Sequence, residues 1–190
     1  YEETSFSYPD THGLLEQLVM DKERNNLIYQ FLSAEVANDH YCILLSDRRK
    51  FCHNWQRWLS RKGIESGLLV GGVEHKEEGD ESIRRIVDNG DLHVVIGTTV
   101  ADEGLDIKRL DRGFSATPTA TNERRIVQQA GRIKRKCEGK KDAIWYYFLD
   151  HKVKGFDKHL KLLKKYFKTV EVLEDKYDIE EYLYHLKGNL

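Results

Sequence analysis

Cysteine and proline are scarce in this sequence, and it has no apolar run long enough for a membrane span. The 190 residues include three cysteines without C-x-x-C spacing and two prolines. Few, unclustered cysteines favour neither a disulfide framework nor a zinc site. The eight histidines are scattered, so we expect no metal bound by this chain's own residues. Because it also lacks a signal-peptide core, we expect an intracellular protein, cytoplasmic or in the nucleoid or nucleus, without a membrane partner.

Charge is nearly balanced overall but unevenly distributed. The net charge is −1, yet residues 124–168 hold 15 Lys and Arg against four Asp and Glu, and the rest of the chain is strongly acidic. A basic region of this kind is typical of a surface that binds a polyanion such as nucleic acid. For any single lysine, a solvated helix face is the better interpretation.

Short apolar runs alternate with amphipathic segments along most of the chain. Strands are predicted at residues 41–45, 68–70, 93–96, 111–117 and 143–149, and helices at 21–37, 48–62, 82–87, 121–135, 153–170 and 177–186. Arg112 and Gly113 interrupt the fourth apolar run, and the charged residues 74–80 are expected to form a surface loop. The alternation predicts an α/β fold with a parallel sheet, helices on both faces, and ligands at the carboxyl ends of the strands.

The most informative segment spans residues 92–135. Its first part is an apolar strand that passes into a turn, where Gly104 precedes Asp106 by two residues. This arrangement suits close approach of the backbone to a charged ligand, with a carboxylate fixed beside it.

The second part of that segment carries Gln128, Gly131, Arg132 and Arg135. Their spacings of three and four residues place them on one face of a predicted helix. Gly131 would let a ligand come close between the two guanidinium groups. Paired arginines on a rigid element usually bind a phosphate whose charge changes during a reaction.

These two parts resemble a known family. Thr98 with Gly104-Leu105-Asp106 resembles motif V of superfamily 2 helicases, and Gln128-x-x-Gly131-Arg132-x-x-Arg135 resembles motif VI. Their order, separation and strand-then-helix context are also similar to that family. The leading Gln resembles the DExH and DNA-translocase branches more than the DEAD-box branch, so DNA is the expected substrate.

The resemblance implies a RecA-like fold of the P-loop NTPase type and a role as the C-terminal motor lobe. In that family ATP lies between two lobes, and the other lobe supplies the phosphate loop, Mg²⁺ and the catalytic carboxylate. This sequence begins at Tyr1 and contains neither a G-x-x-x-x-G-K-[ST] loop nor a D-E-x-[DH] box. We therefore expect an N-terminal RecA-like lobe of the same protein as a partner, and no ATP turnover by this chain alone.

The resemblance also implies a role for each motif residue. Arg132 and Arg135 would contact the γ-phosphate, and Gln128 would couple the nucleotide site to the other lobe. Gly104, Asp106 and Gly131 would lie at the nucleotide, and Thr98 would contact a nucleic-acid phosphate.

Residues 46–62 are similar to the region of motif IV. Ser46 and Arg48 are candidates for contact with the nucleic-acid backbone, and a plain helix cap is the alternative. The stripe of Phe51, Trp55 and Trp58 has the spacing of one helix face, which favours core packing over stacking on bases.

We divide the chain into a linker at residues 1–20, a helicase C-terminal domain at 21–170 and an acidic helical tail at 171–190. The function that we expect is the C-terminal lobe of an ATP-dependent helicase or translocase. Two alternatives stay open: a nucleic-acid-binding module that kept the fold without motor activity, and the motor lobe of a restriction enzyme subunit. The intact arginines of motif VI argue against the first.

Overall fold

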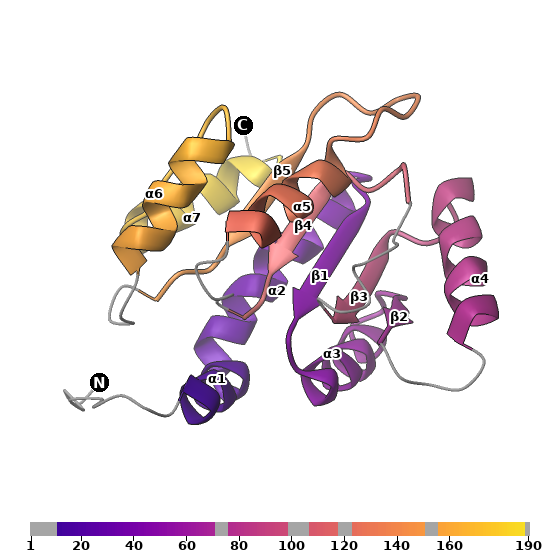
Figure 1. The fold of residues 1–190 in the computed structure, drawn as a ribbon, viewed down its shortest axis with the longest axis horizontal. Coiled ribbons are helices and arrows are strands. Elements are labelled where there is room, and N and C mark those ends of the chain that lie inside the picture. The colour runs from indigo at the N-terminus through magenta and orange to yellow at the C-terminus, as the bar shows by residue number, and fades with distance from the viewer. Residues whose placement is uncertain (1–10, 71–75, 99–106, 118–122, 151–155, 189–190) are drawn as a thin grey trace.

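The structure is a computed structural model that describes residues 11–70, 76–98, 107–117, 123–150 and 156–188. A sheet lies between two layers of helices (Figure 1). In chain order the described elements are α1 (Thr11–Met20), α2 (Lys22–Ala37), β1 (Cys42–Ser46), α3 (Arg49–Arg61), β2 (Gly67–Leu69), α4 (Lys76–Asn89), β3 (Val94–Thr98), β4 (Arg112–Ser115), α5 (Glu123–Ile133), β5 (Ile144–Tyr147), α6 (Phe156–Tyr166) and α7 (Lys176–Leu186).

The five strands form one sheet in the order β2-β3-β1-β4-β5, and every pair is parallel. All residues of the central strands β1, β3 and β4 are buried, as expected for strands covered on both faces. This confirms the predicted α/β fold with a parallel sheet covered by helices on both faces. It also defines two edges: a carboxyl edge where the strands end, and an amino edge where they begin.

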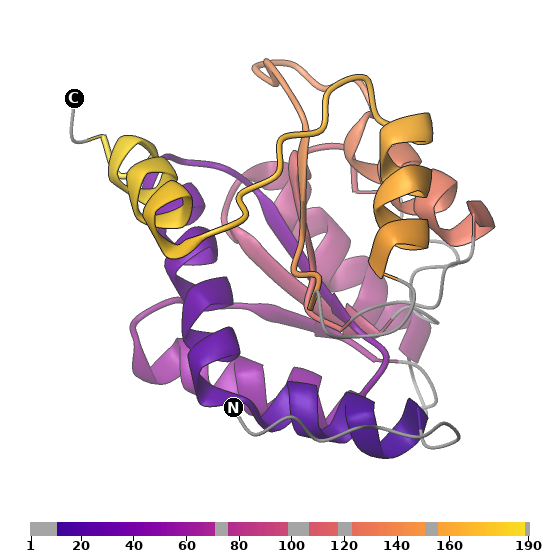
Figure 2. The same ribbon diagram turned by 90° about the vertical axis from the view of Figure 1, so that its left-hand side faces the viewer.

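Two hydrophobic clusters pack on opposite faces of the sheet. Figure 2 shows the helices that lie on either side of it. Leu44 lies in the first cluster, under α2, α3 and α7, and its neighbour Ile43 lies in the second, where α4 and α5 pack. Successive strand residues point to opposite faces, so one apolar run serves both clusters.

The predicted core stripe of α3 is confirmed. Phe51, Trp55 and Leu59 are buried in the first cluster, and Trp58 is half-buried beside them. Aromatic rings at this spacing face the sheet because they share one side of the helix. They are therefore not available to stack on bases.

The loop predicted at residues 74–80 is wrong from Lys76 onward, because α4 begins there. Lys and Glu have good intrinsic helix propensity, so a helix forms without apolar periodicity in its first turns. A pattern that tracks only apolar residues misses such a start.

The interruption of the fourth apolar run by Arg112 and Gly113 does not break β4. A Cβ on Gly113 would lie only 2.3 Å from the indole ring of Trp145 on β5, so only glycine leaves room for that ring. The indole also donates a hydrogen bond to Ser115 Oγ at 2.9 Å. Gly113 on β4 thus leaves the space that the bulky Trp145 on β5 occupies.

Both ends of the described chain pack against α2. Leu18 of α1 is buried, and on the other side Leu183 of α7 joins the first cluster. The rings of Phe31 and Tyr182 stack with centroids 5.7 Å apart. The division into linker, domain and tail stays a prediction. Within the described ranges, the helices fall short of the length and apolarity that a membrane span requires.

Candidate functional site

Ser46 and Thr98 lie side by side at the carboxyl edge. They are register partners at the ends of β1 and β3, and both are buried. The Ser46 hydroxyl accepts a hydrogen bond from the Arg48 amide at 3.2 Å. Among the described residues, the Thr98 hydroxyl has no hydrogen-bond partner. Thr98 is therefore the residue of this pair that retains unused hydrogen-bonding capacity.

Arg48 occupies the N-cap position of α3 without a side-chain cap, and it is half-buried. The preceding residue is bonded to the segment that follows β4, because the Asp47 amide donates to the Thr117 hydroxyl at 3.1 Å. The turn from β1 into α3 is thus fixed from both sides. The hydrogen bond between the Arg48 amide and Ser46 Oγ spans two residues and is that of a local turn. A helix cap was the alternative for Ser46 and Arg48, but Arg48, the N-cap residue, makes no side-chain cap hydrogen bond.

Arg24 was not predicted, yet it holds the carboxyl edge together. Its guanidinium donates to the carbonyl of Ala116, to the carbonyl of Phe148 at 2.9 Å, and to Asp150 at 3.3 Å. Burial lowers its pKa, and Asp150 opposes that shift. The only sequence signal was a cation in the first turn of a helix, where acids are preferred.

One face of α5 packs on the sheet, and the opposite face is exposed. Ile126, Gln129 and Ile133 are buried, whereas Gln128 and Gly131 are exposed. A Cβ on Gly131 would meet nothing within 4 Å among the described atoms. Packing inside this domain therefore does not require glycine at that position.

The prediction that one helix face carries both motif VI arginines is wrong for Arg135. Helix α5 ends at Ile133, so Arg132 lies in its last turn and Arg135 lies two residues beyond it. The side chains of both arginines are half-buried. Only Gln128, Gly131 and Arg132 share the helix.

Lys140 shows where Arg135 lies. Its ammonium donates to the carbonyls of Leu110 at 2.6 Å, Arg135 at 3.0 Å and Lys108 at 3.4 Å. Leu110 comes just before β4, so Arg135 lies at the amino edge of the sheet. Burial lowers the pKa of Lys140.

The predicted residues therefore divide between the two edges. The prediction that motifs V and VI both emerge at the carboxyl ends is wrong for Arg135. Helix α5 returns from the end of β4 to the start of the parallel strand β5, and its 11 residues rise about 16 Å. That length carries its last turn back across the sheet. Gly104 and Asp106 lie outside the described residues.

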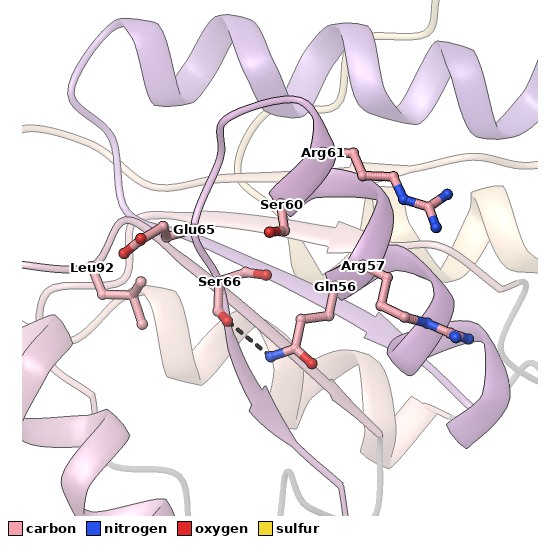
Figure 3. Close-up of a pocket in the computed structure, with 7 residues that line it drawn as sticks. All are labelled: Gln56, Arg57, Ser60, Arg61, Glu65, Ser66 and Leu92. Carbon is pink, nitrogen blue, oxygen red and sulfur yellow. Dashed lines mark hydrogen bonds between the residues drawn. The ribbon is translucent and has the colours of Figure 1, made fainter.

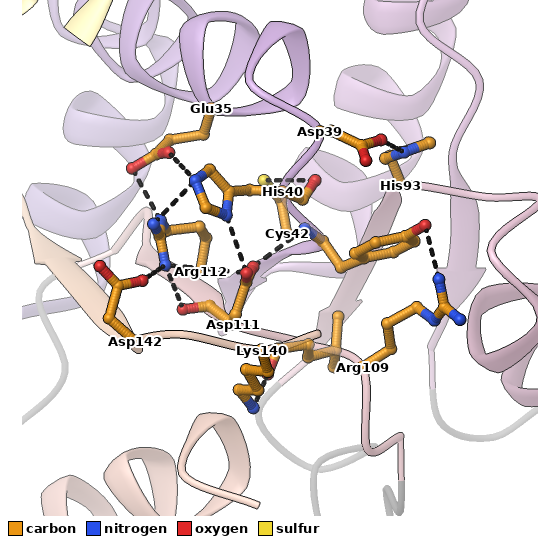
Figure 4. Close-up of polar contacts among 12 residues, drawn as sticks. Glu35, Asp39, His40, Cys42, His93, Arg109, Asp111, Arg112, Lys140 and Asp142 are labelled. Carbon is orange, nitrogen blue, oxygen red and sulfur yellow. Dashed lines mark hydrogen bonds and ion pairs between the residues drawn. The ribbon is translucent and has the colours of Figure 1, made fainter. Parts of the chain in front are cut away.

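A buried polar network also lies at the amino edge (Figure 4). Arg112 Nε is 2.9 Å from Glu35, and its Nη1 is 2.8 Å from Asp142. His40 joins the network through Asp111 at 2.8 Å. Burial disfavours the charge on Arg112, but Glu35 and the aspartates outweigh this effect and raise its pKa. The network fixes the start of β4 to the end of α2.

A groove of about 550 Å³ lies beside the C-terminal half of α3 (Figure 3). Its lining residues are Gln56, Arg57, Ser60, Arg61, Glu65, Ser66 and Leu92. None of the predicted site residues lines it. The groove includes Glu65 beside the arginines and lies at a helix C-terminus, which disfavours an anion.

The sheet topology and the two motifs define a RecA-like domain of the kind that forms the second lobe of superfamily 2 helicases. The helicase conserved C-terminal domain family matches residues 23–137, more than half of the chain. The chain belongs to that family.

Solved structures share the fold at low sequence identity. The C-terminal domain of the DEAD-box protein Dbp5 is 20% identical with a TM-score of 0.61, over 82% of this chain and 90% of that one. The C-terminal part of the Fun30 ATPase domain is 16% identical with a TM-score of 0.59, over 90% of this chain and 56% of that one. S. cerevisiae Dbp5 bound to RNA and ADP BeF3 is 20% identical with a TM-score of 0.60, over 86% of this chain and 43% of that one. This chain thus spans about half of the Fun30 structure.

Proposed function

We propose that this chain is the C-terminal motor lobe of an ATP-dependent nucleic-acid helicase or translocase. ATP and Mg²⁺ would be held mainly by an N-terminal RecA-like lobe, and Arg132 and Arg135 would contact the phosphates of that ATP. Gln128 would contact the N-terminal lobe. The observation that supports this most directly is the place of Arg135 beside residues 108–110, which follow Gly104 and Asp106 in sequence. Arg135 of motif VI thus lies near the residues that follow motif V in sequence.

The carboxyl edge would contact the nucleic-acid backbone. Thr98 has a buried hydroxyl with no partner among the described residues, and Arg48 lies on the same edge. Contacts to the backbone carry no sequence information, so binding would be largely independent of sequence. We favour DNA because of Gln128. The structure of S. cerevisiae Dbp5 holds RNA, so both polymers belong in the test.

The basic surface of α6 would add to this affinity. The exposed lysines of this helix are Lys158, Lys161, Lys164 and Lys165, and Lys168 follows just after its end. Lys165 also pairs with Glu123 of α5 at 2.8 Å. Most of this charge thus faces solvent, where it can neutralise phosphates.

The test is steady-state ATPase of the full-length protein with DNA, with RNA and without either. Arg132→Lys and Arg135→Lys should each lower stimulated kcat by about 10³ to 10⁵, the usual contribution of an arginine finger. Lysine keeps the charge but loses the planar fork. ATP affinity should change little, because the arginines act mainly on charge that develops in the transition state.

Lys136→Gln provides a matched control, because Lys136 is an exposed cation in the same segment. It should retain normal kcat. Thermal melting of each variant separates catalysis from stability, because exposed or half-exposed arginines contribute little to folding. Near-normal turnover in both arginine variants would overturn the motor assignment and favour a binding module without motor activity.

A further inference from the structure

Lys140 places a cation among backbone carbonyls. Its ammonium is half-buried, and the three carbonyls that it contacts belong to Lys108, Leu110 and Arg135. Three donors on one nitrogen match three acceptors, which is the full hydrogen-bonding capacity of an ammonium group. The contacts join two segments that are more than twenty residues apart in sequence.

One of these segments is rigidly anchored. Ile107 and Leu110 are buried in the second core cluster. Asp88 of α4 accepts hydrogen bonds from the amides of Lys108 at 3.1 Å and Arg109 at 3.3 Å. Residues 107–110 therefore form a fixed point, and in the sequence they directly follow the predicted motif V residues.

The other segment follows α5, because Arg135 lies two residues beyond the end of that helix. A tight turn follows, in which the Lys140 amide donates to the Cys137 carbonyl at 3.3 Å. Gly139 adopts φ +81°, a conformation that glycine accepts without strain. This turn brings the Lys140 side chain back beneath Arg135.

We propose that Lys140 is a positioning residue for Arg135: it ties the backbone of Arg135 to the fixed residues 107–110, and so sets where the guanidinium meets the phosphates. This inference rests on the proposed function. A catalytic group must be held within about 0.5 Å of its productive position, and a misplacement of about 1 Å costs about 10²-fold in rate. Lys140 acts through Arg135 and does not touch the nucleotide.

The experiment uses the full-length protein and ATPase kinetics. Lys140→Met should lower kcat by about 10- to 100-fold, with little change in KM for ATP or in nucleic-acid affinity. Lys140→Arg should restore part of the rate, because a guanidinium can still donate to the carbonyls. Lys141→Met is the matched control, because Lys141 is exposed and adjacent, and it should leave kcat unchanged.

A double-mutant cycle distinguishes positioning from general damage. If Lys140 acts through Arg135, Lys140→Met should add little to the loss already caused by Arg135→Lys. Full additivity of the two losses, or a normal kcat in Lys140→Met, would overturn the inference. If Lys140→Met does not fold, Lys140→Gln replaces it in the same cycle, with the same criteria.

The two proposals fail separately. If Arg132→Lys and Arg135→Lys both keep near-normal turnover, the proposed function is wrong, and if only Arg135→Lys does, the positioning role of Lys140 is wrong. If Arg135→Lys is strongly impaired while Lys140→Met is normal, only the positioning role is wrong.

Discussion

The buried pair of Arg112 and Glu35 offers a quantitative test of what holds β4 in place. Both side chains are almost fully buried, at 4% and 1% exposure, and their charged atoms are 2.9 Å apart. Arg112→Met would leave the Glu35 carboxylate with the Tyr146 hydroxyl and His40 as neighbours. A buried charge that loses its partner costs about 3 to 5 kcal/mol, and we expect a loss of this size in the free energy of unfolding.

The double variant separates the pair interaction from loss of volume. Glu35→Leu combined with Arg112→Met removes both charges and keeps apolar volume, so it should recover most of the loss. Asp142→Asn is the control, because Asp142 is 59% exposed and its ion pair with Arg112 should contribute only about 0 to 1 kcal/mol.

Urea denaturation of this chain measures Arg112→Met, Glu35→Leu, the double variant and Asp142→Asn, provided that the m-value stays constant. A loss below about 1 kcal/mol for Arg112→Met would contradict the argument, since the unpaired charge would then be well solvated. The same conclusion would follow if the losses of the two single variants simply added in the double variant.

Three further predictions concern packing, pH and charge. Gly113→Ala should destabilise the protein by about 1 to 3 kcal/mol in the same urea assay, and Trp145→Leu in that background should regain part of the loss, because the overlap is with the indole ring. Stability should fall as pH rises from 9 towards 12, since burial raises the pKa of the Cys52 thiol from 9.0 to about 12 and also raises that of Tyr146, so that only the unfolded chain ionises. Urea unfolding at several pH values checks this, and Cys52→Ala should reduce the slope of the free energy of unfolding against pH. Oligonucleotide binding should weaken linearly in log K against log salt, and no binding at low salt would show that the lysines of α6 are only solvated surface.

Much of the fold could be predicted from the sequence because apolar periodicity reports burial directly. The strand at Cys42–Ser46 and the buried face of α3 follow from such patterns. The two motifs identified the family because each is specific: each requires several residue types at fixed spacing. The ends of helices were predicted less accurately, because α4 begins at Lys76, before its predicted start at residue 82.

Three features depended on contacts or helix ends that residue spacing does not report. In the sequence, Gly113 interrupts an apolar strand, but in the structure the indole ring of Trp145 fills the space that a side chain there would need. Arg135 has helical spacing from Arg132, yet the helix ends between them. The role of Lys140 could not be predicted, because it is one of many lysines in its region and its carbonyl partners come together only in the folded chain.

The packing of α7 on α2 bears on how the chain folds during synthesis. Asn38 at the end of α2 donates a hydrogen bond of 2.6 Å to the Leu186 carbonyl, 148 residues later. The first core cluster includes Leu183 and so cannot close until that residue has left the ribosome. Until then, the aromatic ring of Phe31 lacks its stacking partner. At about 5 to 20 residues per second, α2 would wait roughly 7 to 30 s for α7. During that interval the nascent domain offers an apolar surface to chaperones.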